Sequence, residues 1–279
     1  MNKGVFLAAL AGISWGTIPL AVKQIYTLGP ATALDISFFR FLIAFIFLGG
    51  YAFLRKRGTI LKNKWSVLMG FWGIFWMSVI SFYGIRFTTA VNATILFNAN
   101  PLFVAVLMVL LKWEKLTVVT VSGVVLGIAG VVMVSGGTTL YAWGDFLVLI
   151  GAFGWAVYTV LGYKLRNFSS VSVTVSSLFY GLLFFGVVIW RDVPCVTGSS
   201  WVWVAYIGII PTAAAFLSYI KAVDLIGSTK ASVFQYLAPA VAVIISVVLR
   251  LEQVSLFQIF GILFIVAGIE LTRRNTGRY

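Results

Sequence analysis

Two stretches, NANPLFVAVLMVLLKWEK (residues 98–115) and YLAPAVAVIISVVLRLEQ (residues 236–253), occupy corresponding places in an internal duplication of this chain. The longer segments 90–132 and 228–270 align without a gap at an offset of 138 residues. The matching pairs are Ala93 with Ala231, Pro101 with Pro239, Lys112 with Arg250, Glu114 with Glu252, Gly123 with Gly261, and Ala129-Gly130 with Ala267-Gly268. We therefore expect two related halves, residues 1–137 and 138–279.

The composition places both halves in a membrane. Of the 279 residues, 61% are hydrophobic and only 10% are charged, with a mean hydropathy of +1.06. Soluble domains have about 25% charged residues, so a soluble fold is excluded. The net charge of +13 falls between apolar runs, where it indicates membrane orientation rather than nucleic-acid binding.

Several chemistries lack their usual residues. The chain has no histidine and one cysteine, Cys195. An intramolecular disulfide, His-ligated metal or haem sites, and a histidine general base are therefore excluded. The carboxylates are scattered singly, which disfavours a lipid-modifying enzyme. We expect no enzyme activity, no cofactor and no metal.

Ten spans satisfy the rule that a membrane helix needs about 20 apolar residues. They are residues 4–23, 33–54, 66–86, 90–111, 116–136, 143–163, 171–190, 201–220, 229–249 and 254–272. We therefore predict an all-α integral membrane protein with ten transmembrane helices, five in each half.

The basic residues predict the orientation. Most Lys and Arg residues fall on alternate connectors, with the largest group at 55–64 and another at the C-terminus. By the positive-inside rule both termini are cytoplasmic in a multi-pass protein of the cell membrane. Five spans per copy is an odd number, so the second copy is inverted relative to the first. Inverted repeats let the two halves open alternately to the two sides.

The first helix of each half also matches, at an offset of 140, and the combined motifs resemble a known family. The motifs are Gly12-Ile13-Ser14-Trp15-Gly16, Gly154-Trp155-Ala156 followed by Val157-Tyr158-Thr159, Arg40 within residues 38–42, Gly144-Asp145, and the proline and glutamate of each half. The chain resembles the ten-helix EamA type of the drug/metabolite transporter superfamily over nearly its whole length.

This resemblance implies export or exchange of small metabolites, with amino acids, including aromatic ones, among the substrates of the type. The four-helix multidrug relatives carry a glutamate in their first helix for proton coupling. Here the same region has only Ser14, Trp15 and Thr17. Proton-driven export of cationic drugs is therefore not the expected activity.

The paired prolines predict a binding site near mid-membrane. A proline inside a helix removes the hydrogen bond to the carbonyl four residues earlier, so Pro101 would free that of Phe97 and Pro239 that of Gln235. A free carbonyl in hydrocarbon must face protein, water or solute. The predicted cavity floor consists of Thr94, Phe97, Asn98, Pro101 and Ala105 with Ser232, Gln235, Tyr236 and Pro239. The alternative is that both prolines only kink their helices.

Trp15, Trp155 and Tyr158 are the predicted walls of this cavity, because aromatic faces stack on rings and attract ammonium groups. The alternative is that they face lipid or pack structurally. Arg40 lies inside the second span and is a candidate for binding a substrate carboxylate. Alternatively, it snorkels outward or pairs with Asp35, Asp145 or helix-end carbonyls.

The sequence favours a secondary carrier for amino acids or related zwitterions, acting as a monomer or homodimer on a small-molecule substrate in a lipid bilayer, without nucleic acid. An organic-anion exchanger, of the sugar-phosphate kind, would need two or more cations in the cavity. A non-transporting scaffold would leave the matched prolines unexplained. Small residues at Gly123, Gly127, Gly130, Gly261 and Gly268 predict close helix packing in lipid.

Overall fold

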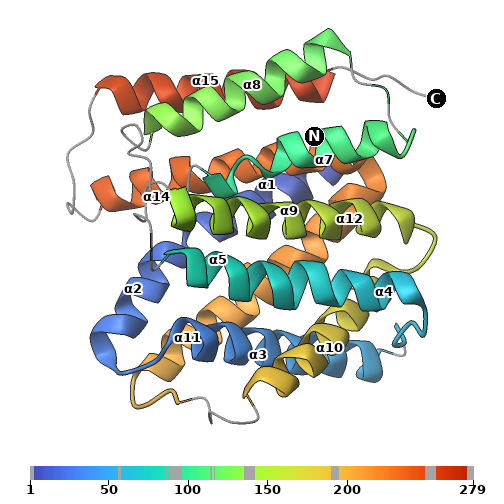
Figure 1. Cartoon of the computed structure of the whole chain (residues 1–279), viewed down its shortest axis with the longest axis vertical. Coiled ribbons are helices and arrows are strands. Elements are labelled where there is room, and N and C mark those ends of the chain that lie inside the picture. Colours follow the sequence, from blue (N-terminus) through green and yellow to red (C-terminus); the bar gives the residue numbers. More distant parts are fainter. Residues whose placement is uncertain are drawn as a thin grey trace.

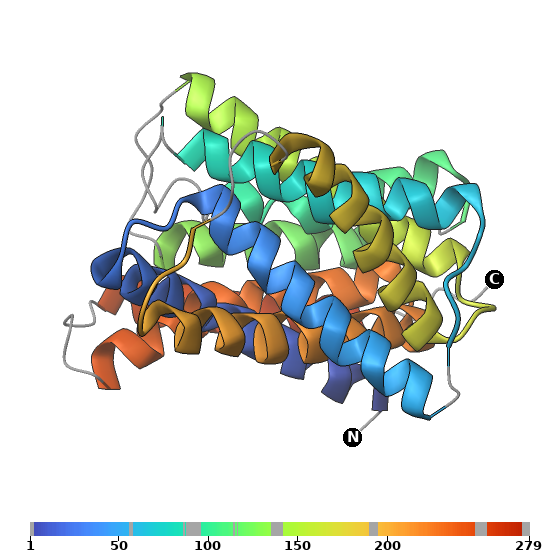
Figure 2. The same ribbon diagram turned by 90° about the horizontal axis from the view of Figure 1, so that it is seen from below.

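A computed structural model describes residues 3–55, 58–85, 87, 96–113, 115, 117–134, 142–189, 195–248 and 256–274. Every regular element within these ranges is helical, and the helices run side by side in a bundle (Figures 1 and 2). The earlier elements are α1 (Lys3–Gly16), α2 (Ile18–Leu28), α3 (Ala33–Leu54), α4 (Lys64–Met69), the π-helix η1 (Gly70–Trp76), α5 (Met77–Ile85), α7 (Asn100–Leu110) and α8 (Val118–Val134).

The later elements begin with a continuous helix, whereas the earlier ones begin with the broken pair α1 and α2. The later elements are α9 (Ala142–Lys164), α10 (Ser170–Ile189), α11 (Ser200–Gly208), the π-helix η2 (Ile209–Ala214), α12 (Ala215–Ile226), α13 (Ser228–Ser232), the 3₁₀ segment η3 (Val233–Tyr236), α14 (Leu237–Val248) and α15 (Leu256–Arg274).

Four of the described helices are long and apolar enough to cross a membrane. They are Ala33–Leu54, Trp143–Lys164, Ser170–Ile189 and Ser200–Ile226. Shorter apolar helices accompany them: Lys3–Gly16, Asn100–Leu110, Val118–Met133 and Ile259–Thr272. The expectation of an all-helical protein with several membrane-spanning helices is therefore confirmed for the described residues.

Two predicted span boundaries are corrected. The first span does not end at residue 23: α1 stops at Gly16, Thr17 forms a turn, and α2 continues to Leu28. Pro19 lies in the first turn of α2, where a missing N–H leaves no helical bond unmade. The eighth span does not end at residue 220 either, because α12 continues to Ile226.

Pro101 and Pro239 lie at junctions between helical segments rather than in the middle of a regular α-helix. Pro101 lies in the first turn of α7, directly after a turn at residues 98–99. Pro239 lies in the first turn of α14, directly after η3. Each proline therefore stands in the first turn of a segment that follows a change in helical geometry. The carbonyl of Gln235 is not free, because it accepts a hydrogen bond from the Leu237 N–H.

Two π-helices interrupt other spans at places 139 residues apart, where η1 and η2 begin. In η2, Pro211 has no N–H for the carbonyl of Ile207. The Thr212 hydroxyl donates to that carbonyl instead, with Oγ1 2.7 Å from the oxygen. In lipid such a replacement donor is required, since water is not available to the freed carbonyl.

Several helix pairs join the earlier and the later part of the chain. In the earlier part, α1 packs against α12 and α14, and α3 packs against η2. In the later part, α9 packs against α5 and α7, and α10 packs against η1. Figure 1 shows α9 between α5 and α7 accordingly. Each of these contacts joins a helix before residue 137 to one after it.

The helices α8 and α15 form a separate close pair along one edge of the bundle (Figure 1). A Cβ added at Gly130 would lie 2.6 Å from the Gly261 carbonyl oxygen, and one at Gly268 would lie 2.7 Å from the Gly127 nitrogen. These backbones approach too closely for side chains. The prediction that the glycines serve helix packing is confirmed.

Candidate functional site

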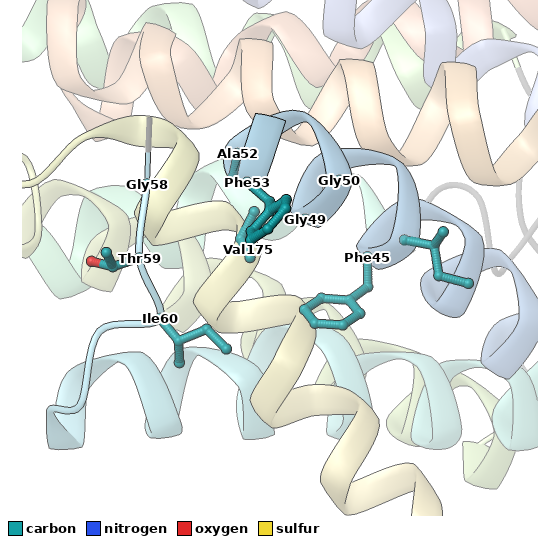
Figure 3. Close-up of a pocket in the computed structure, with 10 residues that line it drawn as sticks. Phe45, Gly49, Gly50, Ala52, Phe53, Gly58, Thr59, Ile60 and Val175 are labelled. Carbon is teal, nitrogen blue, oxygen red and sulfur yellow. The ribbon is translucent and has the colours of Figure 1, made fainter. Parts of the chain in front are cut away.

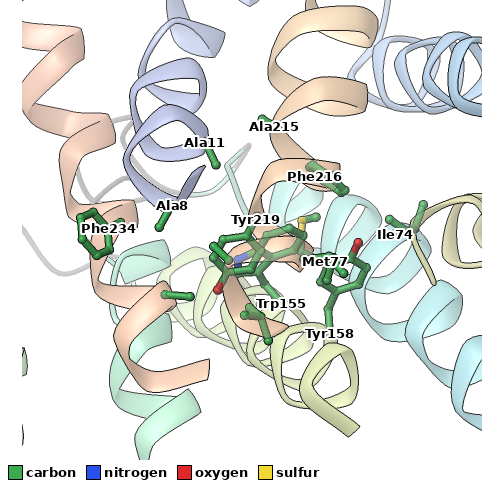
Figure 4. Close-up of a cluster of buried hydrophobic side chains, with 14 of the residues drawn as sticks. Ala8, Ala11, Ile74, Met77, Trp155, Tyr158, Ala215, Phe216, Tyr219 and Phe234 are labelled. Atoms are coloured by element: carbon green, nitrogen blue, oxygen red, sulfur yellow. The ribbon is translucent and has the colours of Figure 1, made fainter. Parts of the chain in front are cut away.

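Five aromatic side chains from three helices meet in the interior, and we call them the aromatic cluster. They are Trp15 of α1, Trp155 and Tyr158 of α9, and Phe216 and Tyr219 of α12. The Trp155 ring stacks on Tyr158 with centroids 4.7 Å apart, and the Trp15 ring meets Tyr219 edge-on at 5.1 Å. Figure 4 shows four of these rings between α9 and α12, with Ala8 and Ala11 of α1 nearby.

Trp15 also connects α1 to the π-helix η2. Its indole Nε1 donates to the Pro211 carbonyl at 2.9 Å. Two residues along the chain, Thr17 Oγ1 accepts from the Tyr206 hydroxyl at 2.8 Å. The break between α1 and α2 is thus held against the span that contains Pro211.

A chain of buried hydrogen bonds, which we call the polar network, lies beside the aromatic cluster. Asn100 Nδ2 donates to Gln235 Oε1 at 2.8 Å, and Gln235 Nε2 donates to the Tyr219 hydroxyl at 3.1 Å. The Tyr219 hydroxyl is also 2.9 Å from Thr159 Oγ1. The network therefore joins α7, η3, α12 and α9.

The helix breaks explain why amides occur at this depth. A residue that precedes proline is disfavoured in helical geometry, and a helix start leaves backbone groups unbonded. Asn100 stands at the start of α7 and Gln235 stands in the 3₁₀ segment before α14. Both amides therefore lie where the spans are interrupted rather than in a regular helix.

Three buried polar atoms in these groups have no hydrogen-bond partner in the part of the chain that the structure describes. They are Asn100 Oδ1, Trp155 Nε1 and the Tyr158 hydroxyl. Leaving a buried polar atom unpaired costs about 1–3 kcal/mol. Unpaired hydrogen-bonding atoms thus lie beside the aromatic rings.

The structure brings some predicted site residues together and places others elsewhere. Trp15, Trp155 and Tyr158 share the aromatic cluster, and Gln235 reaches it through Tyr219. Ser232 Oγ instead donates to the Thr229 carbonyl of its own helix. The Tyr236 ring packs over Gly127, and its hydroxyl donates to the Val124 carbonyl of α8 at 3.4 Å.

The remaining predicted residues lie near the breaks or outside the description. Asn98 is buried in the turn before α7 and makes an interaction of its own. Phe97 is half-buried against the main core. Thr94, and the paired Glu114 and Glu252, lie outside the described residues.

Arg40 is buried in α3, with 6% of its surface exposed. Its guanidinium carbon lies 4.4 Å from the Phe41 ring centroid. Among the described residues it forms no ion pair with Asp35, which instead accepts from the Thr32 N–H in the capping box that begins α3. No pair with Asp145 is formed there either.

Four residues of the site were missed by the sequence interpretation: Asn100, Thr159, Phe216 and Tyr219. The Asn98-Ala99-Asn100-Pro101 run is a turn signal and could have indicated Asn100. Pro211 within an apolar span could have indicated a second break near Tyr219. Nothing local in the sequence indicates that Tyr219 meets Gln235.

The structure also has an apolar groove of about 280 Å³ between α3, residues 58–60 and α10 (Figure 3). Phe45, Phe53, Thr59 and Val175 are among its lining residues. None of the lining residues belongs to the aromatic cluster or the polar network, and Phe53 is 82% exposed. Because this groove is apolar and open, and lies apart from the buried polar groups, we take the interior cluster as the candidate functional site.

The apolar helical fold is that of a multi-pass membrane protein, and comparison with known proteins shows that it is a transporter and gives its family. The profile of the EamA-like transporter family matches residues 2–136 and again residues 142–274. The chain belongs to this family.

Individual relatives agree with the assignment. A protein of Archaeoglobus fulgidus named "Uncharacterized transporter" is 30% identical over 286 residues, covering 97% of each chain. "Uncharacterized transporter YetK" of Bacillus subtilis is 26% identical over 250 residues, covering 84% of this chain and 76% of its own. A solved crystal structure matches with a TM-score of 0.83 over 96% of this chain and 95% of its own; at 22% identity it shows the fold alone.

Proposed function

We propose that the protein is a secondary transporter that moves small metabolites, amino acids or related zwitterions, across the cell membrane by alternating access. The observation that carries this proposal is the polar network beside the aromatic cluster, which connects spans from both parts of the chain at their breaks. Amides and a phenol hydroxyl can bind both the ammonium and the carboxylate of a zwitterion. Aromatic rings can hold its side chain or ammonium group.

Alternating access requires two halves that move against each other. We propose ten transmembrane helices in two inverted five-helix repeats, residues 1–137 and 138–279. The corresponding contacts of α1 with α12 and of α9 with α5 support this arrangement, because each joins the two parts of the chain. The breaks at Pro101 and Pro239 stand 138 residues apart and support it further.

The distribution of charge supports export or exchange without proton coupling. Of the described carboxylates, Asp35 and Asp145 are buried, and both stand in the first turn of a helix rather than in mid-span. An organic-anion exchanger would need at least two buried cations, and Arg40 is the one found among the described residues. The basic connectors support cytoplasmic termini. A single chain supplies the site, so a monomer, or each protomer of a homodimer, transports by itself.

The test is flux of a labelled amino-acid mixture in reconstituted liposomes, comparing wild type with a double variant, Asn100→Leu with Gln235→Met. Both replacements keep the side-chain volume approximately unchanged. Because the two amides are removed together, neither residue keeps a buried amide that has lost its hydrogen bond to the other. We expect thermal stability close to wild type and flux reduced about tenfold or more, the effect of losing one strong hydrogen bond to a charged solute.

A matched control is Thr174→Val, a buried replacement whose lost bond lies within its own helix, to the Ser170 carbonyl. It should transport normally. Wild-type liposomes that move no solute from a complete metabolite pool would refute transport. Unchanged flux in the double variant would move the solute site away from the polar network.

A further inference from the structure

Arg40 is a buried cation without a counter-charge among the described residues. Asp35 is engaged at the start of α3, and Asp224 pairs with Lys221 at 2.5 Å. Asp145 and Glu270 lie on α9 and α15 and form no ion pair with Arg40. The Arg40 Nε has no hydrogen-bond partner in the described part of the chain. A charge at this depth in a membrane protein requires an opposite charge or strong acceptors.

A second unpaired donor lies on the same face of α3. Ser37 precedes Arg40 by one helical turn, is 1% exposed, and its Oγ has no partner among the described residues. Residues three apart are neighbours on a helix surface. The buried face of α3 therefore presents two hydrogen-bond donors, one of them charged, and neither is paired with a described acceptor.

The position of Arg40 in α3 corresponds to that of Ser177 in α10, so only one of the two helices carries a cation there. A Cβ at Gly208 would lie 3.1 Å from the Arg40 carbonyl oxygen, and one at Gly70 would lie 2.8 Å from that of Ser177. Arg40 and Ser177 thus hold equivalent positions against the two π-helical spans. The Ser177 hydroxyl donates to the Thr174 carbonyl of its own helix. The packing itself therefore does not require an arginine.

Arg40 is connected to the aromatic cluster by direct ring contacts. Its guanidinium lies over Phe41, the Phe41 ring is 5.9 Å from that of Phe216, and the Phe216 ring is 5.0 Å from that of Trp155. The unpaired donors are therefore one aromatic layer away from the proposed solute site.

We propose that Arg40 and Ser37 form an anion subsite, which accepts either the carboxylate of the transported solute or a small inorganic anion. Guanidinium is suited to carboxylate because its planar donors match the two oxygens, and the neighbouring hydroxyl adds a third donor. The statement that the bound anion is the carboxylate of a transported solute rests on the proposed transport function. The statement that Arg40 and Ser37 bind an anion does not.

The first experiment measures binding without transport. Purified wild-type protein is titrated with sodium acetate, benzoate or chloride, with sodium HEPES holding the ionic strength constant and acetamide and benzamide as neutral controls. We expect the anions, and not the amides, to raise the Tm. Arg40→Gln should weaken the apparent affinity about tenfold or more, as for loss of a charge-assisted hydrogen bond, and Ser37→Ala less.

Two further variants serve as controls for the anion titration. Arg55→Gln removes the exposed arginine that ends the same helix and should bind anions like wild type. Arg40→Lys retains the charge without the planar fork and should give intermediate affinity, even if Arg40→Gln folds poorly. No anion-specific Tm shift in wild type, or equal shifts in wild type and Arg40→Lys and Arg40→Gln, would overturn the subsite.

The second experiment separates the two sources. Liposome flux is compared for labelled phenylalanine and tyrosine and for the matching amines, phenethylamine and tyramine, with and without chloride. A solute carboxylate at the subsite predicts that Arg40→Gln loses amino-acid flux more than amine flux. An inorganic anion predicts equal loss for both, and a chloride requirement in wild type. Absence of all flux in wild type contradicts the transport proposal, while the binding titration still decides the subsite.

Discussion

At the residue scale, close approach between backbone and ring decides how the aromatic cluster is assembled. Gly73 of η1 lies directly against the Tyr158 ring, so that a Cβ at this position would overlap the ring carbons. Tyr158 is fully buried and stacks on Trp155. A side chain at residue 73 would therefore push Tyr158 out of the stack.

Gly73→Ala should destabilise the protein by about 1–3 kcal/mol, because over-packing forces side chains and backbone to shift. The measurement is thermal unfolding in detergent. Gly50→Ala provides the matched control in α3, since nothing lies within 4 Å of a Cβ placed there. That change should be neutral or stabilise by up to about 1 kcal/mol through the better helix propensity of alanine. Equal stability of the two variants would contradict the close approach of Tyr158.

At the element scale, the π-helix η2 depends on a local replacement for a lost hydrogen bond. Pro211 cannot donate to the Ile207 carbonyl, and the Thr212 hydroxyl does so. The same segment holds α1 in place, because Trp15 donates to the Pro211 carbonyl. Such a break allows the span that contains Pro211 to bend at the point where α1 and α3 contact it.

Thr212→Val should destabilise by about 1 kcal/mol or more, because a buried carbonyl loses its hydroxyl donor. In a Pro211→Ala background the alanine N–H can supply the bond, so the same substitution should cost less. Chemical unfolding of the four proteins in a double-mutant cycle measures this coupling. Costs that are identical in both backgrounds would show that the hydroxyl does not replace the proline N–H.

At the scale of the whole molecule, interhelical contacts join the two parts of the chain at several places. One of these is between α5 and α9, where a Cβ at Gly84 would lie 2.9 Å from that of Leu147. Under the proposed alternating access this contact separates in one state and closes in the other. A covalent link across it should therefore arrest transport.

Cysteines at Gly84→Cys and Leu147→Cys, in a Cys195→Ser background, should form a disulfide after a small separation, since bridged Cβ atoms lie about 3.5–4.5 Å apart. We expect oxidation to abolish liposome flux and reductant to restore it. Each single-cysteine variant serves as a control that oxidation leaves unaffected. Full flux in the crosslinked protein would mean that the α5–α9 contact does not move during transport.

Much of the site could be anticipated from local patterns, and the rest could not. Trp15, Trp155 and Tyr158 were recognisable as aromatic groups at matched helix positions, and the prolines marked the breaks that carry Gln235. The direction of Tyr236, which turns toward Gly127 of α8, was not recognisable. These spans are apolar on all sides, so the period of hydrophobic residues does not distinguish an interior face from a lipid face.

By itself the sequence determined a duplicated, helical membrane chain with a proline break at the same place in each copy, because composition and spacing follow directly from the order of residues. Tertiary structure decided that Asn100 bonds to Gln235, 135 residues away, and that Gln235 bonds to Tyr219. It also decided that Ser37 Oγ and Arg40 Nε have no hydrogen-bond partner among the described residues. Such pairings depend on how each helix is rotated in the bundle, which packing between small residues and helix breaks determines.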